Sequence, residues 1–213
     1  MSSPNENGAG QEGHAPRAVC WDVTQHAVLG ELDSSRSAAD ACAALGWSTK
    51  HMWRAWLYSS REGDPVAVRM KFLHRHESWQ RCAFMQRGRW STEPRTVPLF
   101  GVECLEPGPV SVCIGAAWES PEAFMLRKEA MQDRDWVPTI DAEDSRCWLA
   151  ARGIGAVAFL QAPGVSDALT DWTPLAGRTI HFIPHLSHEA RAVMERVWLL
   201  LKGLGCTLKG GPA

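Results

Sequence analysis

Two short segments in the second half of the chain gather the side chains that could do chemistry. Residues 141–144 carry three acids, namely Asp141, Glu143 and Asp144. Residues 185–189 carry His185, Ser187, His188 and Glu189. Because Mg²⁺ prefers carboxylate oxygens and transition metals bind imidazole, each segment is a candidate for metal-dependent chemistry.

Each segment also has a structural interpretation. Asp141 and Asp144 stand where a helix is expected to begin, and acids there stabilise a helix by roughly 0.3–1 kcal/mol without any chemistry. His181 and His185 have the spacing of one helix face, but they straddle a β run and the loop after it. We therefore favour capping and solvated polar groups for both segments over a metal site or a histidine-based triad.

The elements around these segments alternate between strand and helix. Apolar runs typical of buried strands occupy residues 110–114, 156–160 and 179–183, and a further strand is expected at 136–140. Helices are expected at residues 120–132, at 141–152 and after 188. The last one has an apolar face made of Ala190, Val193, Met194, Val197, Trp198 and Leu201. This alternation predicts an α/β region with a mostly parallel sheet, in which ligands bind after the strand ends.

The first half of the chain has a different periodicity. A helix is expected at residues 36–45, capped by Ser34 or Ser35 and closed by Gly46. Strands follow at residues 55–58, 66–73 and 79–85. In the second strand, Val66, Val68, Met70 and Phe72 alternate with Ala67, Arg69, Lys71 and Leu73. We interpret this pattern as an antiparallel meander whose middle strand has one apolar face and one mostly basic face.

A basic block crosses this meander. Residues 66–92 contain six Lys or Arg residues and one acid, although the whole chain has a net charge of −2. Cations neutralise phosphates and aromatic rings stack on unpaired bases, which predicts a nucleic-acid-binding surface. The predicted contact residues are Arg69, Lys71, Arg75, Arg81, Arg87, Arg89, Trp79 and Trp90. The alternative is that the rings form the buried face of the meander and the cations its solvated face.

Composition limits the remaining classes of protein. With 213 residues, the chain can build one sizeable core or two small domains. Its seven cysteines form no C-x-x-C pair, which argues against a zinc module and for reduced thiols in a cytoplasmic protein. No apolar run approaches the length of a membrane span. We divide the chain into a disordered tail (1–17), a β-rich basic region (18–105), an α/β domain (106–206) and a flexible tail (207–213).

The segment before the last strand reads D-W-T-P-L-A-G-R, from Asp171 to Arg178, and Pro184 and a helix follow that strand. This resembles the Toprim domain of phage- and plasmid-type DNA primases and primase-helicases, which typically read W-x-P-L-x-G-R before such a strand. Residues 98–101 and 109–115 resemble the run into the first motif of that family. The resemblance implies a Toprim-like α/β domain behind a β-rich basic region.

The chain departs from this family at the acids. Toprim catalysis uses a glutamate after the first strand and an Asp-x-Asp after a later strand, because these carboxylates hold Mg²⁺ against phosphate. Here the Asp-x-Asp positions are His185 and Ser187, and the first-motif glutamates fall on Ile114 and Ala116. In a second register, residues 140–144 form the first motif and keep acids there, but the Asp-x-Asp is still missing.

We therefore expect a catalytically degenerate Toprim- or primase-like protein of a mobile element that binds nucleic acid as a replication accessory. Its expected partners are single-stranded DNA or a primer–template, together with replication proteins, and neither a cofactor nor a membrane is expected. One alternative is an active Mg²⁺-dependent primase-type nucleotidyltransferase, with Asp141, Glu143 and Asp144 as catalytic acids. The other is a protein-interaction module without nucleic-acid binding.

Overall fold

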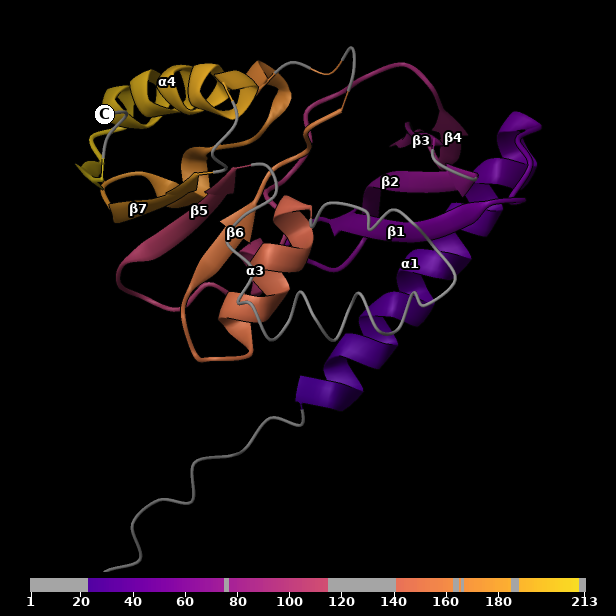
Figure 1. The fold of residues 1–213 in the computed structure, drawn as a ribbon, viewed down its shortest axis with the longest axis horizontal. Helices are drawn as coiled ribbons and strands as arrows, with labels where there is room; N and C mark the ends of the chain where they lie inside the picture. Colours follow the sequence, from indigo (N-terminus) through magenta and orange to yellow (C-terminus); the bar gives the residue numbers. More distant parts are fainter. Residues whose placement is uncertain are drawn as a thin grey trace, which may run out of the picture.

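The computed structural model describes residues 23–74, 77–114, 141–162, 165, 167–184 and 188–210. Within these residues, two four-stranded sheets and three α-helices form a mixed α and β structure (Figure 1). The sheet from the first half of the chain is antiparallel, and the sheet from the second half is parallel. The predicted fold class is confirmed.

The antiparallel sheet is the meander that the period-two pattern predicts. Its strands lie in chain order: β1 (Met52–Ser59), β2 (Pro65–His74), β3 (Glu77–Gln86) and β4 (Arg89–Ser91). Gly63 at φ 91° and Gly88 at φ 75° supply the left-handed backbone that the first and last turns need. β2 and β3 pair without a break, whereas β4 pairs only with the last three residues of β3.

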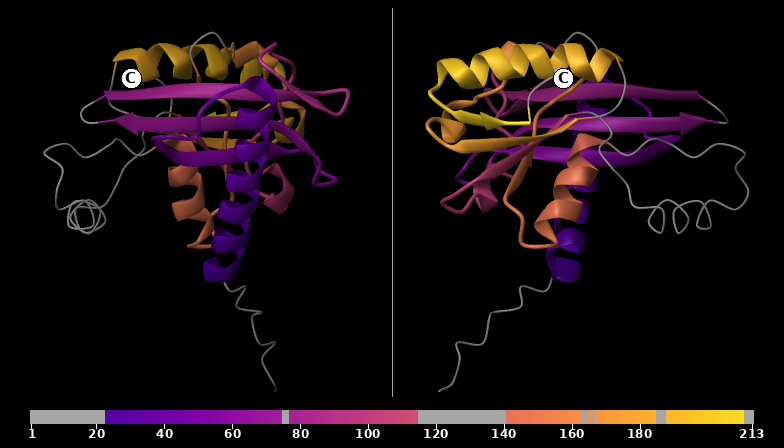
Figure 2. Two further views of the ribbon diagram at one scale, coloured as in Figure 1. Left: turned by 90° about the vertical axis from the view of Figure 1, so that its right-hand side faces the viewer. Right: turned by 60° about the vertical axis from the view of Figure 1, so that its left-hand side comes forward.

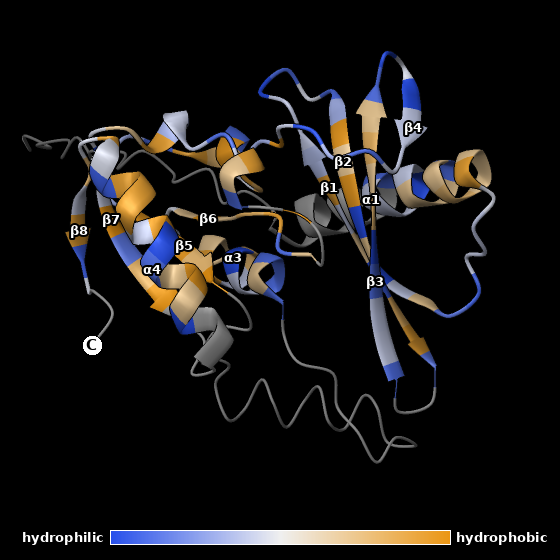
Figure 3. Ribbon diagram, turned by 90° about the horizontal axis from the view of Figure 1, so that it is seen from above, coloured by the Kyte–Doolittle hydropathy of each residue, from blue (hydrophilic) through white to orange (hydrophobic). Residues whose placement is uncertain are grey.

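Helix α1 (Val23–Leu45) covers the outer face of this meander (Figure 3). Ala38, Ala41 and Cys42 are buried against the apolar, even-numbered residues of β2. Small side chains at these positions let the helix approach the sheet closely. Gly46 follows the helix at φ 66° and ends it, as predicted.

The predicted start of this helix is wrong. The helix begins at Val23, so Ser34 and Ser35 lie inside it and cap nothing. The hydroxyl of Ser34 instead accepts a hydrogen bond from the backbone N–H of Leu57 in β1, at 3.2 Å. The serine therefore ties the helix to the sheet.

The parallel sheet has the spatial order β6-β5-β7-β8. Its strands are β5 (Val110–Ile114), β6 (Ala156–Ala158), β7 (Thr179–Pro184) and β8 (Thr207–Lys209). The first three lie in the predicted apolar runs. β8 pairs with β7 in parallel, so the predicted flexible tail is wrong for these three residues.

Two helices cover the two faces of the parallel sheet. α4 (His188–Gly203) packs Met194, Val197 and Leu201 on one face, which confirms the predicted apolar side of this helix. α3 (Ala142–Ala150) lies on the other face, against Cys113 of β5. Among the described residues, no helix is long and apolar enough to cross a membrane.

Several predictions fall outside the described residues. They are the tail at 1–17, the helix at 120–132, the strand at 136–140, and Arg75, Ala116, His185 and Ser187.

Helix α3 lies between the two sheets. One side of it packs on β5 and β6, and its first turn reaches β1 and β2 of the meander. The views in Figure 2 bring α1 to the front in one orientation and α3 in the other. The meander is thus enclosed by α1 on one face and by α3 on the opposite face, and this arrangement decides where its charges point (Figure 3).

Candidate functional site

The two faces of β2 have the composition that the alternation predicts, but the basic face does not point to solvent. Val68, Met70 and Phe72 are buried under α1. Arg69 and Lys71 point toward α3 and are only 3% and 4% exposed. A buried cation needs a partner, because burial without one would cost several kcal/mol.

The partners of these cations are the acids at the start of α3. Asp141 is the N-cap residue of the helix, and its carboxylate accepts from Arg69 at 2.6 Å through Oδ1 and from Lys71 at 2.6 Å through Oδ2. Glu143 is fully buried, and its Oε2 accepts from Arg69 at 2.5 Å. Its Oε1 accepts from the hydroxyl of Tyr58 at 2.5 Å. All four oxygens of these two carboxylates are therefore engaged.

Titration behaviour follows from this packing. Burial raises the pKa of Tyr58 well above its ordinary value, and the negative charge of Glu143 raises it further. Burial alone would lower the pKa of Arg69, but Glu143 and Asp141 more than offset that effect and raise it. The cluster therefore holds Tyr58 neutral and Arg69 charged.

The third acid extends the cluster to β1. Asp144 pairs with Arg54, and its Oδ1 accepts from the indole N–H of Trp56 at 3.4 Å. Its Oδ2 accepts from the backbone N–H of Asp141 at 3.4 Å. The guanidinium of Arg69 lies over the ring of Trp56, 4.8 Å from its centroid. Three acids thus face three cations, and the structural interpretation of Asp141 and Asp144 as residues of a helix start is confirmed.

This geometry does not suit a Mg²⁺ site at residues 141–144. A bound metal would have to displace Arg69 and Lys71 from the carboxylate oxygens they already occupy. Within the described part of the chain, no group of three or more His, Cys, Asp and Glu residues could hold a metal. The acids of residues 141–144 lie together at the start of α3, where they form ion pairs with cations of the meander.

The predicted basic surface is divided by the same arrangement. Arg69 and Lys71 are buried and form ion pairs with the acids of α3. The expectation that they share a surface with the other cations is therefore wrong. Arg81 stands opposite Met70 in the β2–β3 register and therefore projects on the α1 face. Arg87 lies in the turn between β3 and β4 and Arg89 is the first residue of β4, and both are exposed.

The two predicted tryptophans also differ. Trp79 is 37% exposed and stacks on Phe72, with ring centroids 5.5 Å apart and an angle of 6°. Trp90 is partly buried and packs against the core under α1. Of the predicted nucleic-acid-binding residues in the described chain, Trp79, Arg81, Arg87 and Arg89 remain at the surface.

The sheet edge that the resemblance singles out is partly described. β5 and β7 are parallel neighbours, with Ile114 opposite Pro184, so the two strands end at the same edge of the sheet. This is the switch point of the strand order, where open α/β sheets bind ligands. Ile114 is fully buried and has no ligand atom to offer.

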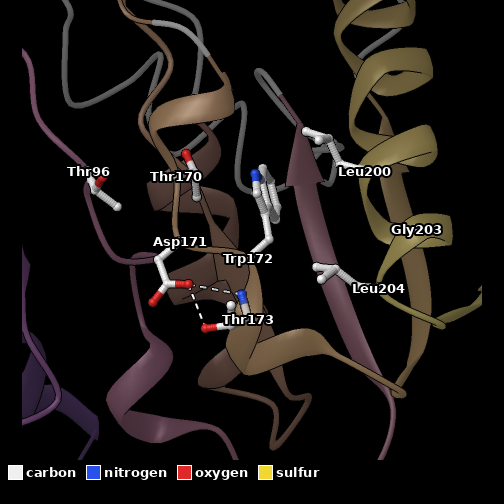
Figure 4. Close-up of a pocket in the computed structure, with 8 residues that line it drawn as sticks. All are labelled: Thr96, Thr170, Asp171, Trp172, Thr173, Leu200, Gly203 and Leu204. Carbon is white, nitrogen blue, oxygen red and sulfur yellow. Dashed lines mark hydrogen bonds between the residues drawn. The ribbon is translucent and has the colours of Figure 1, made fainter.

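The segment from Asp171 to Arg178 serves as scaffold. The carboxylate of Asp171 accepts from the backbone N–H of Thr173 at 3.0 Å and from its hydroxyl at 2.6 Å (Figure 4). Trp172 is buried on Phe159. Arg178 donates to the backbone oxygen of Glu106 at 2.6 Å. These contacts tie the segment to the parallel sheet and to the chain before β5.

This segment also lines a shallow groove beside α4, with a volume of about 340 Å³ (Figure 4). Its lining residues are Thr96, Thr170, Asp171, Trp172, Thr173, Leu200, Gly203 and Leu204. The polar groups of Asp171 and Thr173 are already bonded to each other, so the groove offers mostly apolar surface.

Sequence reasoning missed the pairing of β2 with the start of α3, together with the contribution of Tyr58. The bonded residues are separated by 70 to 85 positions in the chain, and no local pattern reports such a contact. One signal was available, since two cations on alternate positions of a strand and acids at a helix start can neutralise each other. Comparison with family models, with curated proteins and with solved structures finds no match for the chain.

Proposed function

We propose that the chain is a catalytically degenerate Toprim- or primase-like protein of a mobile element, which binds nucleic acid as a replication accessory in the cytoplasm. The observation that carries this proposal is the state of the acids. The carboxylate oxygens of Asp141 and Glu143 all accept hydrogen bonds from Arg69, Lys71 and Tyr58. These acids therefore stabilise the fold and are not free to bind a catalytic metal.

The exposed cations supply the binding surface in this proposal. Arg81 lies on β3, Arg87 in the turn after it and Arg89 at the start of β4. Trp79 adds a ring that is 37% exposed on β3. The phosphates of a single strand bind to cations, and its unpaired bases stack on flat aromatic rings. We expect single-stranded DNA or the single-stranded part of a primer–template as the ligand.

A salt titration tests this function. The binding of a fluorescein-labelled single-stranded DNA is followed by anisotropy between about 50 and 200 mM salt. If three cations each neutralise one phosphate, log K falls with log salt with a slope of about −2, since single strands contribute about 0.7 per contact. The variant with Arg81, Arg87 and Arg89 all changed to Gln should lose most of this slope.

The matched control removes three exposed cations from the other half of the molecule, by Arg191→Gln, Lys202→Gln and Lys209→Gln. It changes the net charge equally and should bind almost as well as wild type. No binding of any strand at low salt would rule out the function, and an equal loss in the control would place the binding surface elsewhere.

The enzyme alternative predicts Mg²⁺-dependent primer synthesis that disappears when Asp141→Ala is combined with Glu143→Ala. The interaction alternative is favoured by one observation, because Leu199 and Leu200 of α4 are 69% and 38% exposed beside the apolar groove. Under this alternative wild type binds no DNA, and Leu199→Lys abolishes binding of the partner protein at that surface.

A further inference from the structure

The outer half of β3 is an open edge in the described part of the chain. β4 pairs only with residues 84–86 of β3, so residues 77–83 have a strand neighbour on the β2 side alone (Figure 3). Glu77, Trp79 and Arg81 alternate along this edge and project on the face that carries α1. All three are exposed.

The ring and the cation on this edge are held in place by other aromatic side chains. Trp79 lies parallel to Phe72, which is only 2% exposed and belongs to the core. The guanidinium of Arg81 lies 4.8 Å from the ring centroid of Trp47, which also packs on that core. Fixed side chains lose little conformational entropy when a ligand binds, so this pair is preorganised.

The spacing of the pair suits a nucleotide. Side chains two positions apart on one strand face are about 7 Å apart, because a strand rises by about 3.4 Å per residue. That separation is comparable to the distance between a base and its own phosphate. The charges give the site a direction, since Glu77 repels a phosphate at one end and Arg81 attracts it at the other.

We propose that Trp79 and Arg81 form a subsite for one nucleotide of a single strand. The base stacks on the exposed part of the Trp79 indole, and the phosphate pairs with Arg81, away from Glu77. Duplex DNA does not fit this subsite, because its base faces are covered by the neighbouring base pairs. The subsite rests on the proposed function, which requires nucleic-acid binding but does not require this geometry.

The test compares three probes: a single-stranded oligodeoxythymidylate, an abasic strand of the same length, and a duplex. Trp79→Ala should weaken binding of the oligodeoxythymidylate by about 5- to 150-fold, the range expected for the loss of one stacked base. On the abasic strand the same variant should bind within about twofold of wild type, because no base is present to stack. Arg81→Gln should weaken both single strands and lower the salt slope by about 0.7.

Two further variants separate stacking from packing. Trp79→Phe keeps a ring and should retain most of the affinity for the oligodeoxythymidylate. Trp79→Leu keeps an apolar side chain over Phe72 but has no ring, so it should lose that affinity. Their thermal unfolding should match wild type within a few degrees. If wild type binds but Trp79→Ala binds equally well, or loses as much on the abasic strand, the subsite is wrong and the proposed function stands. If wild type binds no probe, both are wrong.

Discussion

On each of its two faces the meander has an arginine that lies over a tryptophan ring, with opposite outcomes. On the face toward α3, Arg69 lies 4.8 Å from the ring of Trp56, and on the face toward α1, Arg81 lies 4.8 Å from the ring of Trp47. Arg69 is buried and bonded to two carboxylates, whereas Arg81 is exposed. Stacking on tryptophan is thus common to both, and the acids of α3 make one arginine part of the core.

This difference separates a structural role from a binding role for the same residue type. The inner cations, Arg69 and Lys71, bind the first turn of α3 to the meander. They thereby also link the meander to the parallel sheet on which that helix packs. Among the described residues, the outer cations Arg81, Arg87 and Arg89 pair with no carboxylate, and Arg81 lies two positions from the exposed ring of Trp79 on the same face of β3. Variants of the inner group should therefore change the free energy of unfolding, and variants of the outer group should change binding.

The largest effect is expected for Arg69→Met. It leaves Glu143 buried without its cation, and breaking a buried ion pair from one side costs about 3–5 kcal/mol of unfolding free energy. Arg81→Met, the same change on the outer face, should cost less than about 1 kcal/mol. Urea denaturation measures both variants, and adding Glu143→Gln to Arg69→Met should restore part of the loss. Equal costs for the two single variants would contradict the proposed difference between the faces.

A smaller effect is expected for Tyr58→Phe. A hydrogen bond to a charged group contributes about 1.5–3 kcal/mol, so the variant should lose about that amount at neutral pH. Tyr58 is the single tyrosine of the chain, so its ionisation can be followed by phenolate absorbance. In the folded protein this absorbance should stay absent above pH 10, the ordinary pKa of tyrosine, because burial and then Glu143 raise the pKa of Tyr58.

The sign of the pH dependence follows from that raised pKa. Stability from the neutral phenol is fully present below the unfolded pKa of about 10 and is lost as the pH rises above it. Burial also raises the pKa of Cys82 and of Cys113 to about 12, and these thiols add their own loss from about pH 9. The informative quantity is therefore the difference between wild type and Tyr58→Phe. A difference that does not shrink above pH 10 would contradict a buried phenol at this position.

The smallest effect on stability is expected for Arg87→Gln combined with Arg89→Gln. Arg87 is exposed in the turn before β4 and Arg89 is exposed at the start of β4, so the free energy of unfolding should change by less than about 0.5 kcal/mol. The affinity for single-stranded DNA should still fall, with about 1.4 lost from the salt slope. Stability loss without a change in binding would reverse the roles assigned to the two groups.

The sequence predicts the local parts of this comparison well. Alternation from Val66 to Leu73 gives the meander and the two faces of β2, and Asp141 is correctly identified as the cap of α3. These features are set by side-chain periodicity and by hydrogen bonds between near neighbours, which a single sequence displays.

The parts that fail depend on distant contacts. A basic strand face has the same sequence pattern whether it faces solvent or the acids of another element. The burial of Arg69 can therefore be predicted only when the packing of α3 on that face is known. Ser34 has the side chain of an N-cap, but its partner is in β1. β8 has only three residues, too few for a periodic signal, and its pairing with β7 defines it.

The most direct test of the account is photochemical crosslinking of a bromodeoxyuridine-substituted single strand, followed by peptide mapping. Aromatic side chains in contact with the base are the expected sites of crosslinking. We predict that the crosslink maps to the β3 peptide that contains Trp79 and is lost in Trp79→Leu. A crosslink that maps to α4, or one that is unchanged in Trp79→Leu, would contradict the assignment of nucleic-acid binding to the outer face of the meander.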